Sequence, residues 1–365
     1  MKTNGATTEQ KLLSIIVPIY NVEKWLPDCL DSLLSQNIPL EAYEIICVND
    51  GSSDDSLGVL CRYAQKYSNI TIINKSNGGV STARNAGIDA AKGKYLWFVD
   101  SDDKIRVNIL KDIFENVNEE DMICLGYQNI REEDIGLKRT PDDFEYISDL
   151  NITDDAGYSK YDHMDYFVRN SVVLALIKRS MILRYGLRFD IDLHYSEDWH
   201  FKSLVESRSK RIGLADTVAY YYRQRNDSAI HNDSPEAKRR YCHAWVRAAV
   251  LYKQQIEEHG NEMNDYYNSF FKTKMLLSAE SAVLSHAFLD KKTFNSTIAE
   301  MKTLGIYPYD FIKSNLDLKQ YASIKQKLLS LFKYPFPLEW YAKAAAFFCR
   351  HLPGKRNQSG RVDKR

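Results

Sequence analysis

Three carboxylates end an apolar stretch of strand length. Residues 95–99 read as a buried β-strand, and Asp100, Ser101, Asp102 and Asp103 follow at once. In an open α/β sheet, ligands bind beyond the carboxyl ends of the strands, so acids placed there are expected to face a crevice. Two carboxylates two positions apart can offer oxygens to one Mg²⁺ or Mn²⁺, which keeps its other positions for water and substrate phosphates. The alternative is an acidic turn whose aspartates cap the next helix, and the stretch alone leaves both interpretations open.

Strand and helix patterns alternate over the first hundred residues. Apolar, β-branched runs at residues 12–19, 43–48, 70–73 and 95–99 predict four strands, and apolar residues at helical spacing predict a helix after each of the first three. Strands that alternate with helices imply βαβ units and a parallel sheet. Because the carboxyl ends of parallel strands share one edge, we expect Tyr20, Asp50 and the acidic stretch to meet in one crevice.

The residues of this predicted crevice suit a nucleotide. The chain has no G-x-x-x-x-G-K-[ST] and no G-x-G-x-x-G after the first strand, which excludes a P-loop and disfavours a dinucleotide site. Tyr20 could flank a base, Asp50 could accept a hydrogen bond from a base N–H, and Arg84 could meet a phosphate in a bidentate way. The structural alternatives are a core tyrosine, a turn aspartate and a solvated helical arginine.

Four segments in order resemble the motifs of the family 2 inverting glycosyltransferases, which have a GT-A fold. The segments are S-I-I-V-P-I-Y-N at 14–21, V-N-D-G-S-S-D at 48–54, G-V-S-T-A-R-N-A-G at 79–87 and F-V-D-S-D-D at 98–103. The resemblance is strong over residues 12–105, fair to residue 227 and absent beyond. It implies an α/β fold of GT-A type, with a Rossmann-like nucleotide-binding sheet and a mixed acceptor half.

The resemblance also assigns roles. It implies that Ile19, Tyr20 and Asp50 hold the base, usually the uracil of a UDP-sugar, and that Arg84 helps to fix the nucleotide. Asp100 would reach the ribose with Ser101 beside it, and Asp102 would ligate Mn²⁺ or Mg²⁺ on the diphosphate. A divalent ion there neutralises the charge that builds on the UDP leaving group.

A second acidic pair, Glu197 and Asp198, lies in a segment that again resembles the family. The pair would open a helix beneath the acceptor site, and Asp198 would be the base that takes the proton of the acceptor hydroxyl. An unperturbed aspartate, with a pKa of about 3.9, is ionised at neutral pH. The alternative is that Ser196 caps the helix and the two acids favour its dipole.

Basic residues at 223–231 follow an expected strand at 218–222. They could close over a diphosphate, and His231 could complete the metal shell through a ring nitrogen. Solvated arginines and a surface histidine are the alternative.

The composition limits the possible binding partners and the cellular compartment of the protein. The 365 residues are enough for two or three packed units, and the balance of 49 basic and 49 acidic residues predicts no nucleic-acid partner. Six dispersed cysteines suit a reducing cytosol. The first residues lack the apolar core of a signal peptide, and no run of 18 apolar residues occurs, so we expect a cytoplasmic protein.

We expect two domains. Residues 1–230 would form the GT-A domain, with a nucleotide half at about 12–105 and an acceptor half at about 106–230. Residues 231–365 would form a helical C-terminal region with a basic tail, which serves packing, homo-oligomerisation or acceptor selection. Aromatic residues crowd positions 336–348, and basic residues follow. This tail predicts peripheral contact with the anionic inner face of the membrane, and the alternative is a packed helix with a basic end.

The sequence thus predicts a metal-dependent inverting glycosyltransferase. It would move a hexosyl or N-acetylhexosaminyl group from a UDP-sugar to a hydroxyl of a carbohydrate or lipid-linked acceptor, in the synthesis of a cell-surface polysaccharide or glycoconjugate. A sugar-1-phosphate nucleotidyltransferase is the rival enzyme, but it needs a Gly-rich basic loop where this chain has P-I-Y-N at 18–21. A non-catalytic sugar-binding relative is the other alternative, and loss of Asp102 or Asp198 would mark it.

Overall fold

The chain divides into two compact units, Met1–His231 and Asn232–Arg365. The structure, a computed structural model, describes residues 11–131, 145–151, 171–224, 235–260, 271–272, 274–275, 278–279, 281–282 and 291–307. His231 and the basic tail lie outside these residues, as does most of the loop at 223–231. The roles predicted for these residues stay predictions.

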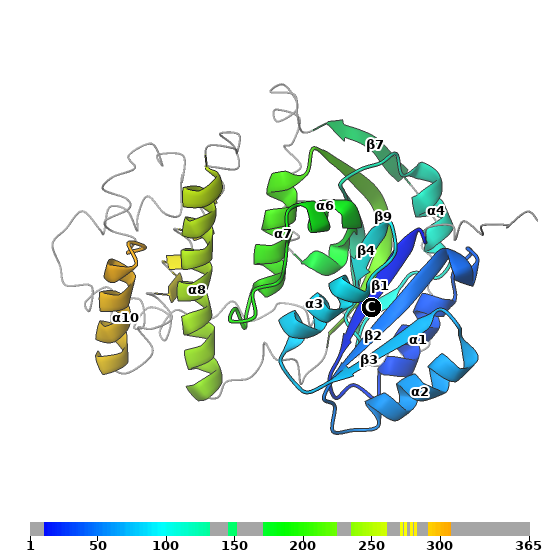
Figure 1. The fold of residues 1–365 in the computed structure, drawn as a ribbon, viewed down its shortest axis with the longest axis horizontal. Helices are drawn as coiled ribbons and strands as arrows, with labels where there is room; N and C mark the ends of the chain where they lie inside the picture. Colours follow the sequence, from blue (N-terminus) through cyan, green and yellow to red (C-terminus); the bar gives the residue numbers. More distant parts are fainter. Residues whose placement is uncertain are drawn as a thin grey trace, which may run out of the picture. The chain divides into compact units, whose positions relative to one another are not determined.

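The first half of unit 1 is a parallel βαβ sheet (Figure 1). Its elements are β1 (Leu13–Ile19), α1 (Leu26–Leu34), β2 (Tyr43–Asp50), α2 (Ser56–Lys66), β3 (Ile70–Lys75), α3 (Val80–Ala90) and β4 (Tyr95–Phe98). The strands lie in the order β3-β2-β1-β4, and each pair is parallel. Every residue of β1, β2 and β4 is buried, because helices cover both faces of a sheet of this kind. The predicted four strands and three helices are confirmed.

The second half of unit 1 extends the same sheet with mixed strand directions. Its elements are β5 (Lys104–Ile105), α4 (Ile109–Asn116), β6 (Met122–Arg131), β7 (Glu145–Asn151), a 3₁₀ turn (Val172–Leu174), β8 (Ala175–Lys178), α6 (Arg179–Arg184), α7 (Glu197–Arg208) and β9 (Arg211–Gln224). The order continues β4-β8-β6-β9-β5, and β7 pairs with β9. β8 is antiparallel to β4 and β6 is parallel to β9. The acceptor half is therefore mixed, as predicted.

Two packing features fix α3 and α7 against the sheet. α3 lies on the face opposite α1 and α2 (Figure 1). A Cβ on Gly87 would come within 2.3 Å of Ile16 Cγ2, so only glycine lets α3 approach β1 this closely. Phe201 of α7 stacks on Phe189 with ring centroids 3.9 Å apart, and both rings meet the edge or face of Phe98 at the end of β4. This cluster holds the start of α7 near the carboxyl end of β4.

Most of the residues that the structure describes in unit 2 are helical. Its helices include α8 (Pro235–His259) and α10 (Lys291–Thr303), in the region where the sequence predicts helices. Within the described part of the chain, no helix has both the length and the apolar character that a membrane span requires.

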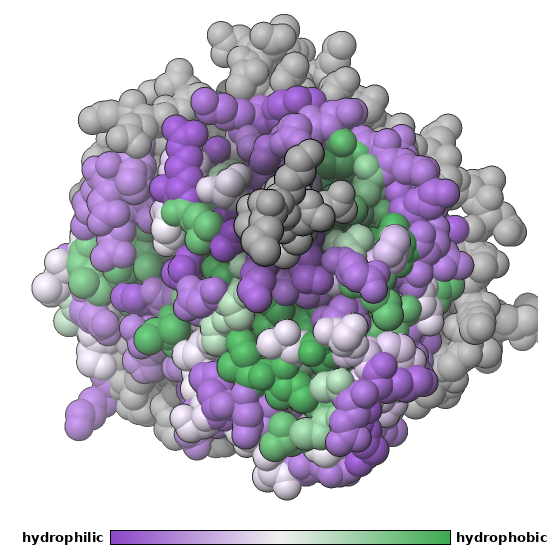
Figure 2. All heavy atoms as spheres, turned by 45° about the vertical axis from the view of Figure 1, so that its right-hand side comes forward, coloured by the Kyte–Doolittle hydropathy of each residue, from purple (hydrophilic) through white to green (hydrophobic). Residues whose placement is uncertain are grey.

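The surface of the molecule is mixed in character. Figure 2 shows one face on which hydrophilic residues cover most of the area and hydrophobic residues gather near the middle. Singly exposed apolar side chains are ordinary in folded proteins, so this view by itself marks no binding site.

Candidate active site at the strand ends

The carboxyl ends of β1, β2 and β4 lie at one edge of the sheet. Ile19 pairs with Asn49 between β1 and β2, and Ile16 pairs with Phe98 between β1 and β4. Tyr20, Asp50 and the acidic stretch after β4 therefore emerge together, as predicted. Ile19 is buried, whereas Tyr20 follows it with 51% of its surface exposed. An exposed aromatic ring beside a buried strand end suits the predicted contact with a base.

Asp50 is buried and already holds a loop in place. Its Oδ1 accepts a hydrogen bond of 3.0 Å from the Gly78 N–H, and its Oδ2 accepts one of 2.8 Å from the Gly79 N–H. The ammonium group of Lys75, at the end of β3, forms an ion pair with the same carboxylate. Gly79 has φ +87°, a conformation that glycine adopts without strain. Asp50 thus fixes the start of α3, and its contact with a base stays a prediction.

Arg84 of α3 joins the two halves of unit 1. Its Nη2 donates to Asp100 Oδ1 and its Nη1 donates to Glu197 Oε1, each at 2.9 Å. The guanidinium also lies 5.3 Å from the centre of the Phe189 ring. Burial acts to lower the pKa of Arg84, but the charges of Asp100 and Glu197 outweigh it and raise the pKa. The arginine is therefore a permanent cation held by one carboxylate from each half.

The acidic stretch does not present all three carboxylates to the crevice. Asp103 is only 1% exposed, and it accepts hydrogen bonds from the Tyr220 hydroxyl at 2.6 Å and the Arg223 N–H at 2.7 Å. Burial, with the charges of Asp102 and Asp100, raises its pKa well above the usual range. The expectation that these acids face a crevice is therefore wrong for Asp103, which anchors the stretch to β9. Ser101 is also buried.

Arg223 supports the acidic stretch from within and does not lie over a diphosphate. Its side chain is fully buried, its Nε donates to the Asp102 carbonyl oxygen at 2.7 Å, and its Nη2 donates to Asp28 Oδ2 at 2.5 Å. Lys104 pairs with the same Asp28 at 2.8 Å. The prediction that the basic residues at 223–231 close over a diphosphate is wrong for Arg223, because Arg223 lies within β9 and its charge is already matched inside the protein.

Asp198 stands at the start of α7, beside the pair formed by Arg84 and Glu197. Ser196 precedes the helix with φ +62° and makes no side-chain cap hydrogen bond, so the alternative in which Ser196 caps α7 is wrong. Burial and the charge of Glu197 raise the pKa of Asp198 from its ordinary 3.8 to about 6, although Arg84 acts in the opposite direction. A carboxylate with a pKa near the working pH is a stronger base than an ordinary aspartate.

Tyr222 is a crevice residue that the sequence analysis did not single out. It is 36% exposed, and burial together with the charges of Asp103, Asp100, Asp102 and Asp198 raises its pKa. Its hydroxyl therefore stays protonated as a donor near these carboxylates. Residues two apart in a strand share a face, so Tyr222 follows Tyr220 towards the acidic stretch, but the sequence alone does not place Tyr220 there.

The carboxylates fit a metal ion only in part. Among the described residues, no group of three or more His, Cys, Asp or Glu side chains is placed to hold a metal. Asp100 pairs with Arg84, and Asp103 is bonded to Tyr220. Asp102 is half-buried, and the carboxylate at this position stays the predicted metal ligand. Mg²⁺ and Mn²⁺ fit such a donor set when substrate phosphates and water supply the other oxygens.

We expect Tyr220→Phe to loosen the acidic stretch. The Tyr220 hydroxyl donates to Asp103 and accepts from the Asp100 N–H at 3.2 Å, so its loss removes one of the hydrogen bonds to the buried Asp103 carboxylate and the one from the Asp100 N–H. Such a loss costs about 1–3 kcal/mol. Urea unfolding should show this decrease in the free energy of unfolding. Tyr20→Phe, which removes the hydroxyl of a tyrosine that is 51% exposed, is the control. Equal stability of wild type and Tyr220→Phe would contradict the anchoring role.

Comparison with known proteins agrees with this geometry. Residues 14–173 match the family model described as "Glycosyl transferase family 2". The chain is 34% identical over 217 residues to the uncharacterized glycosyltransferase EpsJ of Bacillus subtilis, covering 60% of this chain and 62% of EpsJ. It is 32% identical over 222 residues to a poly(ribitol-phosphate) beta-glucosyltransferase of Bacillus spizizenii, covering 59% of this chain and 32% of that protein. The match therefore spans less than two thirds of either relative.

The fold also matches a solved structure. Staphylococcus aureus TarS 1-349, in complex with UDP-GlcNAc, superposes with a TM-score of 0.59 at 20% identity, covering 92% of this chain and 88% of that one. This likeness supports the GT-A architecture seen in the strand order. Residues 14–173 of this chain are a glycosyltransferase family 2 domain with a GT-A fold.

Proposed function

We propose that this protein is a metal-dependent inverting glycosyltransferase. It takes a hexosyl or N-acetylhexosaminyl group from a UDP-sugar and transfers it to an acceptor hydroxyl during synthesis of a cell-surface polysaccharide or glycoconjugate. Relatives at 32% and 26% identity carry names that state such a transfer, a beta-glucosyltransferase and the beta-N-acetylglucosaminyltransferase TarS, both of poly(ribitol-phosphate). These names support the reaction class, and they leave the sugar and the acceptor of this chain open.

One observation carries the proposal. Arg84 binds Asp100 after β4 with one arm and Glu197 of α7 with the other, both at 2.9 Å. The acids of the donor half and the Glu-Asp pair of the acceptor half therefore lie around a single guanidinium. A transferase needs the residues that bind its donor and the residues that bind its acceptor within one crevice. Holding both reactants in the right orientation removes much of the entropic barrier to their reaction.

The residues divide the chemistry between them. Tyr20 flanks the base at the end of β1, and Asp50 with its loop lies on the same side of the crevice. Asp102 would hold Mn²⁺ or Mg²⁺ with the diphosphate oxygens, and such an ion neutralises charge on the leaving UDP. Asp198 takes the proton of the acceptor hydroxyl as that oxygen attacks the anomeric carbon, which inverts its configuration. Asp100, with Ser101 beside it, would reach the ribose.

The direct test is turnover of a donor. The full-length protein is incubated with Mn²⁺ and a panel of UDP-sugars, and release of UDP is recorded with and without a chelator. We expect one UDP-sugar to be consumed faster than the others, and only while the metal is present. Equal background release from every member of the panel would contradict the proposal. A GDP-sugar consumed in place of a UDP-sugar would keep the reaction class and overturn the UDP assignment.

The basic tail gives a separate prediction about the acceptor. We propose that the tail attaches the protein to anionic membrane at the cytoplasmic face, where a lipid-linked acceptor would lie. Each Lys or Arg near an anionic surface adds roughly 1 kcal/mol of binding. The basic residues concerned are Lys355, Arg356, Arg361, Lys364 and Arg365. Full-length protein should sediment with anionic liposomes and be released by high salt. The variant with these five residues changed to Gln should stay in the supernatant, and equal sedimentation of the two would contradict the attachment.

A further inference from the structure

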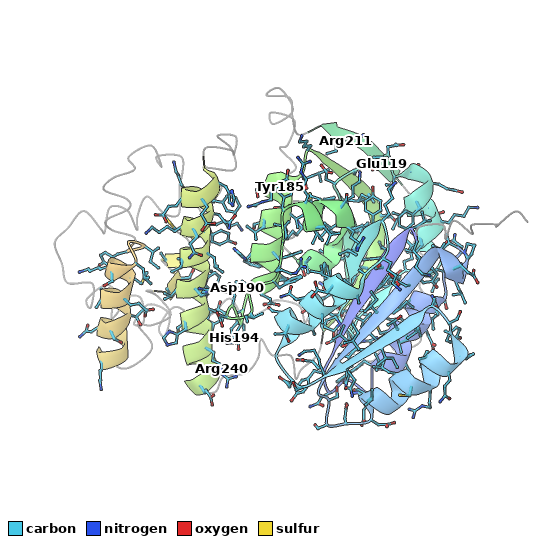
Figure 3. The ribbon with its side chains drawn as sticks, viewed as in Figure 1. Glu119, Tyr185, Asp190, His194, Arg211 and Arg240 are labelled. Carbon is cyan, nitrogen blue, oxygen red and sulfur yellow. The ribbon has the colours of Figure 1, made fainter. Side chains whose placement is uncertain are left out.

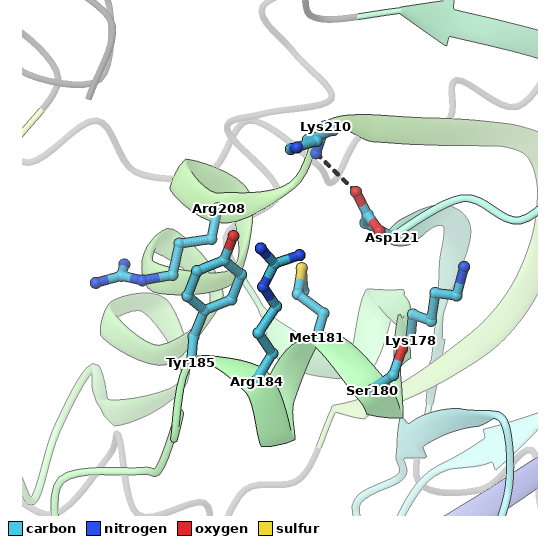
Figure 4. A pocket seen from close by; sticks show the side chains of 8 residues that line it. All are labelled: Asp121, Lys178, Ser180, Met181, Arg184, Tyr185, Arg208 and Lys210. Atoms are coloured by element: carbon cyan, nitrogen blue, oxygen red, sulfur yellow. Dashed lines mark hydrogen bonds between the residues drawn. The ribbon is translucent and has the colours of Figure 1, made fainter. Parts of the chain in front are cut away.

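A pocket of about 300 Å³ lies at the junction of β8, α6, the end of α7 and the start of β9. Four basic side chains line it, Lys178, Arg184, Arg208 and Lys210. We call it the basic pocket. Figure 4 shows Arg184 and Lys178 pointing from the β8–α6 segment towards the segment that carries Lys210. Its volume is at the lower end of the range for small-ligand sites.

The basic pocket lies at the end of α7 opposite the crevice. α7 begins at Glu197 and its 12 residues end at Arg208, which separates the two ends by about 17 Å at 1.5 Å per residue. β8 is antiparallel to β4, and Lys178 pairs with Tyr95 at the start of β4. The basic pocket therefore lies near the amino end of β4, away from the acidic stretch. In Figure 3, Tyr185 lies at one end of α7 and His194 at the other.

The acids near the basic pocket are already engaged. Asp121, the acidic side chain in its lining, accepts the backbone N–H of Lys210 at 2.7 Å and that of Arg211 at 3.3 Å. Glu119 pairs with Lys178 at 2.7 Å and also with Lys94. Within the described ranges, neither Arg184 nor Lys210 has a carboxylate partner for its side chain. Their charges are therefore not matched by this part of the protein.

The two guanidinium groups of the basic pocket share one aromatic ring. The Arg184 guanidinium lies 5.4 Å from the centre of the Tyr185 ring, and that of Arg208 lies 5.9 Å from the same centre. Figure 4 shows the ring between the two arginine side chains. The ring face attracts each cation. The ring thus helps to hold the Arg184 guanidinium at the lining of the basic pocket.

We propose that the basic pocket binds a phosphate dianion, either inorganic phosphate or the phosphate of a small phosphomonoester. Guanidinium and ammonium donors form their strongest hydrogen bonds with such oxygens, and the planar fork of Arg184 matches two of them at once. Ser180, an exposed residue in the lining of the pocket, adds a hydroxyl donor. The binding is a property of this end of α7 and does not depend on the proposed transfer reaction.

The test is calorimetric titration of the full-length protein at low ionic strength, with inorganic phosphate in one arm and glycerol 3-phosphate in the other. Saturable binding of both with equal affinity would assign the site to phosphate alone, and tighter binding of glycerol 3-phosphate would assign it to a phosphomonoester. In the double variant Arg184→Gln, Lys210→Gln we expect affinity to fall at least about tenfold, the size of one lost charge-assisted hydrogen bond.

Two further variants make the result decisive. Arg62→Gln removes an exposed arginine of α2 and should bind phosphate as the wild type does. Lys210→Gln alone changes one exposed side chain, so its phosphate affinity can still be measured if the double variant fails to fold. Absence of saturable binding to wild type, or unchanged affinity in both pocket variants, would overturn the proposal. Because the readout is binding and not turnover, failure here is separable from failure of the proposed transferase activity.

Discussion

Asp198→Asn should lose most of its transfer activity while the folded protein becomes more stable at neutral pH. The amide keeps the size of the side chain but cannot take the proton of the acceptor hydroxyl, and loss of a general base typically slows a reaction about 10²–10⁴-fold. Affinity for the donor should hardly change. Steady-state kinetics with the donor found in the panel, together with calorimetry for UDP, measure the two effects separately. Turnover by the Asn variant within a few-fold of wild type would contradict the assignment.

The stability gain follows from the sign of the pKa shift. The pKa of Asp198 is raised from 3.8 to about 6 by burial and by the charge of Glu197, so ionisation opposes folding. This loss of folding free energy is absent below pH 4 and complete above pH 6. At about 1.4 kcal/mol per pKa unit it amounts to roughly 2–3 kcal/mol. Urea unfolding at pH 8 should therefore show the Asn variant to be more stable, and the difference should vanish at pH 4. The kcat/KM of wild type should fall with decreasing pH through about 6.

Arg84→Met should cause a large loss of stability and move the pH dependence of kcat/KM to higher pH. The substitution leaves Asp100, Glu197 and Asp198 in a partly buried site without their shared cation. Removing one partner of a buried ion pair costs about 3–5 kcal/mol, and the 32% exposure of the Asp100 side chain favours the lower value. Because Arg84 lowers the pKa of Asp198, its loss should move the acidic limb of kcat/KM to higher pH.

An exposed arginine of the same half supplies the control for Arg84. Arg62 pairs with Asp55 at 3.1 Å, but both side chains are more than half exposed, and such pairs contribute at most about 1 kcal/mol. Arg62→Met should therefore unfold at nearly the same urea concentration as wild type and keep the same pH profile. If Arg84→Met lost no more stability than Arg62→Met, the arginine would not hold the two halves together in the way we describe.

The sequence predicted the parallel half of the sheet well because that half is built from short-range patterns. β1, β2 and β4 are fully buried, so they read as continuous apolar runs between turn residues. The meeting of Tyr20, Asp50 and the acidic stretch followed from the parallel pairing alone. Residues 171–177 form an apolar run that is typical of a strand, but the run begins as a 3₁₀ turn and only Ala175–Lys178 pairs with the sheet. An apolar run by itself cannot distinguish the two.

The parts of the site that were missed depend on long-range contacts. Arg84 and Glu197 are 113 positions apart, and Tyr220 lies 117 positions after Asp103. No periodicity or spacing in one sequence relates residues at such separations, so the inward turn of Asp103 could not be foreseen. The same reason explains why Arg223 was read as a solvated cation or a diphosphate ligand and not as a buried support.

Binding of UDP with Mn²⁺ to Asp102→Ala, compared with Asp198→Asn, tests most directly the claim that the crevice has a donor side and an acceptor side. Calorimetry should show that Asp102→Ala loses the metal-dependent part of its affinity for UDP, while Asp198→Asn binds UDP as wild type does. Unchanged Mn²⁺-dependent affinity in Asp102→Ala, or an equal loss in both variants, would contradict the account.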